Sequence, residues 1–346
     1  MKASPADNWP ADWKACYDSF LLRAQERSGS RHTGIKYAQI IRDFFALYPQ
    51  KSPDEILQSE VESYLRSHTT GNGRAGRSPS PGLQNARLSA LTSMYSYSSK
   101  YGIRGEDGRV YALLRTLAPT ANIRRVSEAR NYKSLAPDEL TRLFATMDQS
   151  TERGARDYAL FSTLFYTSRR LQEILSLRWG DISEVEVQED GQTYSIHEFG
   201  FVGKGTSRIR DVQELPQQSV AAIGRYLSFG GRIDAIQPED PIFLGNAYQA
   251  HPRSKPRKRD LKKPLTAQAV WRNLHCYGQL AKLRVPIHPH MLRHSSARLR
   301  YLNGEKLQDI QHTLKHRNIS TTSAYIDGIC SQVDHGSRLL AAAVNL

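Results

Sequence analysis

The sequence predicts a mainly α-helical protein of two domains, with a small antiparallel β element in the second. Apolar residues recur at helical spacing through most of its 346 residues, a length that suits two cores. Between Leu117 and Ser134 this periodicity fades and basic residues accumulate, as in an inter-domain linker. Within residues 193–215, β-branched and aromatic residues gather instead. We therefore expect domains at 1–120 and 134–346, joined by a basic linker at 121–133.

The first domain is expected to be a helical bundle from about Trp13 to Tyr101. Ser52, Pro53 and Glu55 have the spacing of N-cap, N1 and N3 residues, so we expect them to open a helix that continues through Leu65. A loop rich in Gly, Ser, Pro and Arg follows. The next helix is expected to bury a face formed by Leu83, Ala86, Leu88, Leu91 and Met94.

The second domain begins with a helix whose first turn holds Pro137, Asp138 and Glu139, where acidic side chains meet the positive end of the helix dipole. Two helices are predicted next, at 157–165 and 171–179, and Asp181 ends the second. The period then changes to that of strands at 193–202 and 209–215. From Ala267 onward the pattern is helical again.

The composition favours a polyanionic partner. Lys and Arg total 48 against 34 Asp and Glu, which gives a formal net charge of +14. No apolar run approaches the roughly 20 residues of a membrane-spanning helix, and the N-terminus has no apolar export segment. We therefore expect a cytoplasmic protein that is not bound to a membrane. The three cysteines are widely separated and are interpreted as structural thiols.

The second domain also contains an unusual set of side chains that handle phosphate. They are Arg170 at a helix start, Lys204 between two glycines, His290 and Arg293 one helical turn apart, and His316 shortly before Tyr325. Arginine grips two phosphate oxygens, histidine and lysine donate protons, and a tyrosine hydroxyl can be a nucleophile. No nearby Asp/Glu cluster offers a Mg²⁺ cage, so these cations would neutralise the transition-state charge. We expect neither a metal nor a cofactor.

Three segments of the second domain carry a family resemblance. Residues 167–182 read TSRRLQEILSLRWGDI, residues 290–297 read HMLRHSSA, and residues 314–325 read LKHRNISTTSAY. In this order they resemble the first arginine box, the H-x-L-R-H box and the L-G-H-x-x-I-x-T-T-x-x-Y box of the tyrosine recombinase, or phage integrase, family. Ser168 and Lys315 depart from the family pattern, since each stands where the family has a glycine. Glycine often marks a left-handed backbone position.

The resemblance implies a site-specific DNA recombinase that needs neither metal nor ATP. Tyr325 would form a 3′-phosphotyrosyl bond, while the family's roles for the other positions fall on Arg170, Lys204, His290, Arg293 and His316, with Glu173 in support. It also implies a helical core-binding domain that clamps DNA, and a tetramer on two double-stranded DNA sites at the nucleoid, with accessory DNA-binding proteins as possible partners. Two alternatives stay open: a type IB topoisomerase-like enzyme and a non-catalytic DNA-binding relative.

Two basic segments are candidate DNA contacts outside the boxes. The linker holds Arg124 and Arg125, and a proline-broken stretch holds Arg253, Lys255, Arg257, Lys258 and Arg259. The linker is equally interpretable as a solvated tether or as a strap along phosphates. For the proline-broken stretch we slightly favour contact with the DNA backbone over a solvated loop, because it is the densest basic patch in the chain. The apolar tail at 339–344 likewise fits two roles, packing against a neighbouring protomer or closing its own domain.

Overall fold

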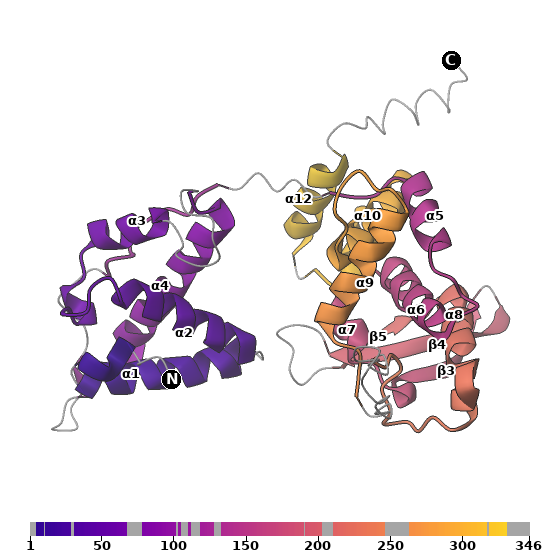
Figure 1. Ribbon diagram of the computed structural model, residues 1–346, viewed down its shortest axis with the longest axis horizontal. Coiled ribbons are helices and arrows are strands. Elements are labelled where there is room, and N and C mark those ends of the chain that lie inside the picture. Colours follow the sequence, from indigo (N-terminus) through magenta and orange to yellow (C-terminus); the bar gives the residue numbers. More distant parts are fainter. Residues whose placement is uncertain are drawn as a thin grey trace, which may run out of the picture. The chain divides into compact units, whose positions relative to one another are not determined.

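The structure is a computed structural model in which the chain divides into two compact units, with the division between Ala129 and Arg130. It describes residues 5–9, 11–28, 31–67, 78–101, 103–104, 110–111, 118–127, 133–189, 191–202, 210–245, 263–316 and 318–330. The predicted fold class is confirmed, because helices dominate both units and a small antiparallel sheet lies in the second (Figure 1).

Helices around an aromatic core form the N-terminal unit. Their bounds are α1 Ala11–Ser28, α2 Arg31–Phe45, α3 Gln58–Arg66 and α4 Pro81–Tyr101, with short 3-10 helices η1 Pro5–Asn8 and η2 Pro53–Glu55. The fully buried ring of Phe44 contacts Phe45, Tyr48 and Tyr64, which joins α2 to α3. After α4, the two-residue strands β1 Ile103–Arg104 and β2 Val110–Tyr111 pair antiparallel.

The single helix predicted from Pro53 through Leu65 is wrong. The predicted capping residues do act together, since the Ser52 backbone N–H donates to Glu55 Oε2 at 2.8 Å, but they cap only the short η2. Ile56 then turns extended and buries its side chain. The Leu57 backbone N–H donates to a second carboxylate, Glu60 Oε2, at 2.9 Å, and α3 begins one residue later. Burial of Ile56 therefore divides the segment into two elements.

Residues 118–127, which include the first part of the predicted linker, are held against α4. The Asn85 side chain exchanges two hydrogen bonds of 2.9 Å with the Val126 backbone. Arg125 donates to Ser89 Oγ at 3.0 Å, and both Arg124 and Arg125 remain exposed. Residues 118–127 are therefore attached to the N-terminal unit instead of forming a free tether.

The C-terminal unit is built around α6, which is buried on most of its surface and packs against α8 and α10. The helices are α5 Pro137–Ala145, α6 Glu152–Thr167, α7 Leu171–Leu175, α8 Gln217–Ser228, α9 Ala267–Leu280, α10 Pro289–Leu302, α11 Leu307–Leu314 and α12 Ile319–Cys330, with 3-10 helices η3 Trp179–Asp181 and η4 Phe229–Asp234. Leu160 and Phe161 of α6 are fully buried in the core. Among the described residues, no helix is both long and apolar enough to span a membrane.

A buried polar network fastens α6 to α9. Asp157 is fully buried and accepts hydrogen bonds from Arg156 at 2.6 and 2.9 Å, from Asn273 at 3.0 Å and from Tyr277 at 3.1 Å. Arg156 also donates to the Leu244 carbonyl at 3.1 Å. A buried charge pair is tolerated when each partner is hydrogen-bonded in this way.

The sheet has the order β3-β4-β5 with antiparallel neighbours: β3 Ile182–Glu189, β4 Gln192–Val202 and β5 Arg210–Glu214. The two predicted strands correspond to β4 and β5. The sequence analysis missed β3, although Val185 and Val187 alternate with acidic residues as expected of a half-exposed strand. Only the end of β4 near Phe199 and Phe201 is buried, and this end adjoins α7.

The helix predicted at 171–179 is too long, because α7 ends at Leu175. Beyond it the backbone pairs with a distant segment: the Trp179 N–H donates to the Asp240 carbonyl at 3.0 Å, and the Ile242 N–H donates to the Leu177 carbonyl at 3.1 Å. These long-range hydrogen bonds replace the helical ones, so α7 remains short.

Candidate active site

The turn between α6 and α7 presents the first arginine of the site. Ser168 ends α6 in the left-handed conformation with φ of 53°, which reverses the chain direction. Arg170 then becomes the N-cap residue of α7. Glu173, which is buried, accepts the Arg170 backbone N–H at 2.9 Å with Oε2 and the Arg170 guanidinium at 2.9 Å with Oε1. The carboxylate therefore fixes both the backbone and the side chain of Arg170, which keeps 33% of its side chain exposed.

Arg293 joins this turn to two other segments. It lies on α10, is 4% exposed, and donates to the Ser168 carbonyl at 2.5 Å and to the Leu314 carbonyl at 2.7 Å. Its Nη2 is also 3.3 Å from Nε2 of His316. Burial is the main influence lowering the Arg293 pKa, and nearby Arg170 adds to it, whereas Tyr325 and Glu173 oppose it.

His316 follows the second left-handed position of the site. Lys315 ends α11 with φ of 50°, and the ring of His316 then lies between Arg293 and Thr322. Because a guanidinium only donates, His316 Nε2 is the acceptor and Nδ1, 3.0 Å from Thr322 Oγ1, carries the proton. Burial and the neighbouring arginines lower the His316 pKa to about 4, so the resting imidazole is neutral at pH 7.

Tyr325 lies on α12 with its ring packed between two histidines. Its ring centroid is 4.8 Å from that of His294 and 5.6 Å from that of His316, the latter edge-on. Tyr325 is also close enough to Arg293 to raise the pKa of that guanidinium against the effect of burial. Tyr325 is 6% exposed and belongs to a small apolar cluster with Ile310, Leu314 and Ile326. The tyrosine is thus held by packing beside an arginine.

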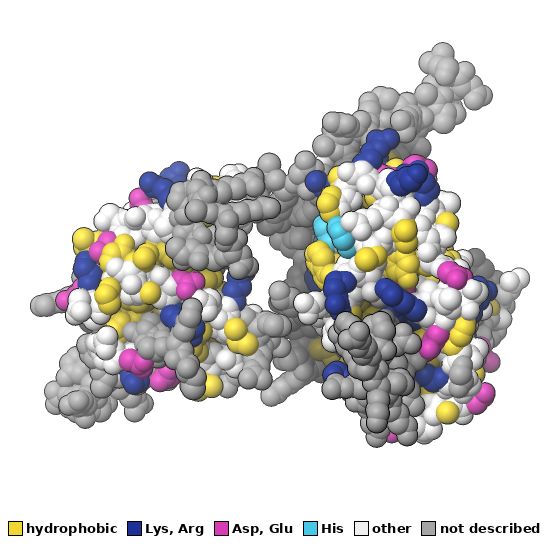
Figure 2. Space-filling view, viewed as in Figure 1, with side chains coloured by type: hydrophobic (Ala, Val, Ile, Leu, Met, Phe, Trp, Pro, Cys, Tyr) yellow, Lys and Arg dark blue, Asp and Glu magenta, His cyan; other side chains and the backbone are white. Residues whose placement is uncertain are grey.

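His290 lies one turn before Arg293 on α10, with an exposed side chain. Neighbouring residues still remove part of the water around the ring, and this desolvation is the main cause that lowers its pKa, while the positive charges of Arg293 and Arg170 lower it further. The structure therefore brings Arg170, Glu173, His290, Arg293, His316 and Tyr325 into one neighbourhood. Figure 2 shows basic side chains and a histidine on the face of this unit where α9 and α10 lie.

Several predicted residues lie outside the described part of the chain. Lys204 is one, and the others are the DNA-contact candidates Arg253, Lys255, Arg257, Lys258 and Arg259, together with the apolar tail. Among the residues that are described, no group of three or more His, Cys, Asp or Glu side chains is arranged to hold a metal ion.

Three residues of the site were not predicted from the sequence. Thr322 Oγ1 lies 3.0 Å from Nδ1 of His316, His294 packs on the Tyr325 ring, and Arg169 is buried with its guanidinium 4.0 Å from the Glu173 carboxylate. Each stands inside or next to one of the three boxes. A helical projection would have placed Thr322 and Tyr325 on one face of α12, because they are three positions apart.

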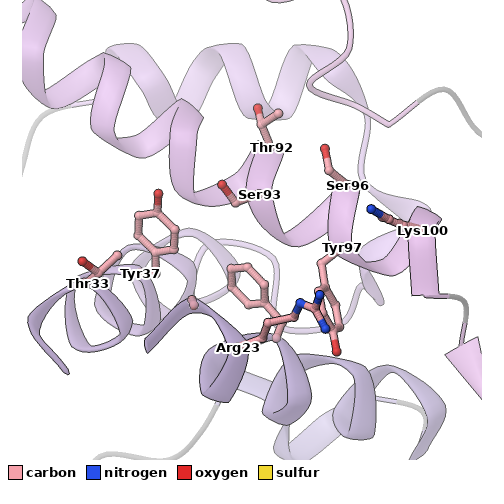
Figure 3. A pocket seen from close by; sticks show the side chains of 10 residues that line it. Arg23, Thr33, Tyr37, Thr92, Ser93, Ser96, Tyr97 and Lys100 are labelled. Atoms are coloured by element: carbon pink, nitrogen blue, oxygen red, sulfur yellow. The ribbon is translucent and has the colours of Figure 1, made fainter. Parts of the chain in front are cut away.

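The N-terminal unit has a cavity lined partly by hydroxyl and basic side chains. A cavity of about 750 Å³ lies among α1, α2 and α4 and is lined partly by Arg23, Thr33, Ser93 and Lys100. Figure 3 shows hydroxyl groups from α2 and α4 and basic side chains from α1 and α4 around this space. Hydroxyl and cationic groups are the usual donors to phosphate oxygens.

Comparisons with known proteins show which family this chain belongs to and which proteins it resembles. Residues 133–328 match the model of the phage integrase family, so the chain belongs to that family. Tyrosine recombinase XerD of Rhizobium meliloti is 27% identical over 328 residues, which cover 91% of each chain.

Two solved structures share the fold. XerH site-specific recombinase, in a post-cleavage complex with palindromic difH substrate, gives a TM-score of 0.62 at 19% identity, covering 97% of this chain and 84% of that one. A λ integrase tetramer bound to a Holliday junction gives 0.61 at 16% identity, covering 95% of this chain and 81% of that one.

Proposed function

We propose that this chain is a site-specific DNA recombinase that cuts and rejoins DNA through a 3′-phosphotyrosyl bond at Tyr325. The observation that carries the proposal is the position of Tyr325, whose ring packs edge-on against His316, which is itself 3.3 Å from the Arg293 guanidinium. A tyrosine beside a buried arginine suits attack on a phosphodiester, because the cation stabilises the charge that develops on phosphorus-bound oxygens. Family membership and the name of the XerD relative support the same chemistry.

In the proposed reaction the Tyr325 hydroxyl attacks the scissile phosphorus in line. The Tyr325 Oη–P bond forms as the bond from phosphorus to the 5′-oxygen breaks. Arg170 and Arg293 hold the non-bridging oxygens, while Lys204 protonates the departing 5′-oxygen and His290 accepts the tyrosine proton. A 5′-hydroxyl from a partner strand then attacks the phosphotyrosine and restores a phosphodiester. The bond energy is conserved, so ATP is not required.

His316 must change its hydrogen bonding during this reaction. At rest its Nε2 accepts from Arg293, whereas a hydrogen bond to a phosphate oxygen requires a proton on Nε2. A phosphodiester anion in the site would oppose the arginine charges that lower the His316 pKa, which favours the protonated ring. Thr322 would keep Nδ1–H in place while Nε2 turns from acceptor to donor.

We infer that the partner is double-stranded DNA and that four protomers act on two DNA sites. The DNA-bound XerH complex and the λ integrase tetramer on a Holliday junction support this assembly. Because the proposed substrate is double-stranded DNA, we expect the chain at the nucleoid, with accessory DNA-binding proteins as further candidates for partners.

The basic segments and the cavity of the N-terminal unit are proposed to contact the DNA backbone. Charge-neutral variants at Arg124 and Arg125, at Arg23 and Lys100, and across 253–259 test these three sets separately. Loss of a phosphate contact reduces the steepness with which DNA affinity falls with salt, by about 0.9 per contact. A set whose neutralisation leaves the slope unchanged does not contact phosphates.

Covalent trapping tests the proposed nucleophile. The full chain is incubated with nicked suicide duplexes that cover the sequences flanking its own gene, and adducts are separated on a denaturing gel. We expect an adduct on a 3′-phosphate with the parent chain and none with Tyr325→Phe. An equal adduct from Tyr325→Phe refutes the assignment of Tyr325, and DNA binding without any adduct favours a non-catalytic DNA-binding relative.

A further inference from the structure

Arg169 is a buried cation directly beside the proposed active site. Its side chain is 1% exposed, and its guanidinium carbon lies 4.8 Å from the centroid of the Phe201 ring. Its Nε donates to the Thr167 carbonyl at 3.4 Å, and its Nη1 is 4.0 Å from Glu173 Oε2. Neither terminal nitrogen of Arg169 has a hydrogen-bond acceptor among the described residues.

Such a side chain is costly to bury. A guanidinium taken out of water loses its hydration, and a long ion pair with one carboxylate replaces only part of it. Burial lowers the Arg169 pKa to about 10, and the charges of Arg293 and Arg170 act in the same direction against Glu173 and Asp211. The group nevertheless stays charged at pH 7. An apolar side chain would fill this space without that cost, so the charge itself calls for a role.

The contacts of Arg169 indicate where that role lies. Glu173 is between two guanidinium groups: its Oε2 accepts the Arg170 backbone N–H and faces Arg169, while its Oε1 accepts the Arg170 side chain. On its other side, Arg169 covers Phe201 of β4, which is paired in register with Asp211 of β5. Arg169 thus connects the start of α7 to the buried end of the sheet.

We propose that Arg169 is a positioning residue that fixes the Glu173 carboxylate, and through it the Arg170 guanidinium, relative to the end of the β4–β5 pair. The inference rests on the proposed function, in which Arg170 holds the scissile phosphate. Arg170 is one-third exposed and is held by Glu173 through an ion pair and a backbone hydrogen bond. Without Arg169 the carboxylate loses one of its two counter-charges and pulls Arg170 into other rotamers.

The kinetic test uses the full chain with Arg169→Met, which keeps the length but not the charge, and Arg169→Lys, which restores the charge. Arg225→Met is the matched control, because Arg225 is an exposed arginine of the same unit. With saturating suicide DNA, we expect Arg169→Met to slow adduct formation by about 10- to 100-fold, the effect of a misplaced catalytic group. The Kd for DNA should stay within about twofold, since a buried side chain makes no DNA contact. Arg169→Lys should recover most of the rate, and Arg225→Met should match the parent.

A second measurement reports on Arg170 itself without requiring cleavage. In a chain labelled with ¹⁵N-arginine, the Arg170 Nε–H signal is expected to broaden or shift in Arg169→Met and to return in Arg169→Lys. If the parent forms no adduct on any duplex, the proposed function fails while this signal still tests the role of Arg169.

Three outcomes would overturn the inference. The first is a parental cleavage rate in Arg169→Met. The second is an Arg170 signal that does not respond to either substitution. The third is an equal loss of rate and thermal stability in Arg169→Met and Arg169→Lys, which would show that Arg169 matters only for packing.

Discussion

The left-handed residues Ser168 and Lys315, which precede Arg170 and His316 in the chain, should respond oppositely to substitution by glycine. Ser168 and Lys315 have φ of 53° and 50°, a region that costs a residue with a Cβ about 1–2 kcal/mol relative to glycine. Glycine also gives the unfolded chain more conformational freedom, which offsets about 0.4–1 kcal/mol of this gain in stability. The backbone alone therefore favours either glycine by roughly 0.5–1 kcal/mol.

The contacts of the two side chains decide whether each glycine variant is more or less stable than the parent. Lys315 Nζ is 3.8 Å from Asp211 Oδ1 in a partly exposed pair, which contributes only a few tenths of a kcal/mol by a rough estimate. Ser168 is fully buried and donates to Ser296 Oγ at 2.8 Å, and losing a buried hydrogen bond costs about 1–3 kcal/mol. We expect Lys315→Gly to stabilise the chain by about 0.5 kcal/mol and Ser168→Gly to destabilise it by about 1 kcal/mol.

Thermal unfolding of the full chain measures both effects. At about 2–4 °C per kcal/mol for a unit of this size, Lys315→Gly should raise Tm by roughly 1–2 °C and Ser168→Gly should lower it by roughly 2–4 °C. Lys315→Ala is the control, because alanine removes the same ion pair but keeps the strain. If Lys315→Gly were no more stable than Lys315→Ala, the left-handed backbone would not be a source of strain and the reasoning would be refuted.

Three further predictions follow from the contacts of the C-terminal unit. Thr322→Val removes the acceptor of His316 Nδ1–H and should slow adduct formation by about 10-fold or more. Thr322→Ser keeps the hydroxyl and should react at a rate close to that of the parent. Equal rates for the two variants would contradict the role of Thr322 in orienting His316. Burial, with nearby His290, His288 and Arg293, lowers the folded-state pKa of His294 to about 3 against 6.5 for an ordinary histidine, so the unfolded chain binds more protons between these values. The contribution of His294 to the free energy of unfolding should therefore be fully present above pH 6.5 and decrease as the pH falls towards 3. In urea titrations, the free energy of unfolding should fall less steeply with decreasing pH in His294→Gln than in the parent. Asp157→Asn leaves Arg156 without its buried counter-charge and should lower the free energy of unfolding in urea by about 3–5 kcal/mol. The control is Asp138→Asn, which removes an exposed ion pair with Arg142. If Asp157→Asn lost as little stability as this control, the buried network would not be important for stability.

Local patterns in the sequence were sufficient for much of the fold and for the choice of candidate residues. Helical periodicity located α4 and α6, and the β-branched segment located β4. The failures came from long-range contacts. No local signal near Leu175 shows that Trp179 will bond to Asp240 and end the helix, and none near Glu55 shows that Ile56 will be buried in extended form.

The candidate site divides in the same way. Arg170, Arg293 and Tyr325 could be chosen from the three sequence segments that resemble the family's motifs, because the proposed phosphoryl transfer needs these residue types. The partners that orient them were not, since Ser168 offers a backbone carbonyl to Arg293 and Arg169 acts from a buried position. The two glycine departures were informative for a physical reason: both positions proved to be left-handed.

The contacts of Arg293 also bear on when the site can form during synthesis. This one side chain bonds to carbonyls at Ser168, 125 positions earlier in the chain, and at Leu314, 21 positions later. Such distant pairings form only after the intervening chain has left the ribosome. The proposed nucleophile, Tyr325, follows all of them. A nascent chain would therefore complete these contacts of Arg293 before it presents Tyr325, the residue proposed to cut DNA.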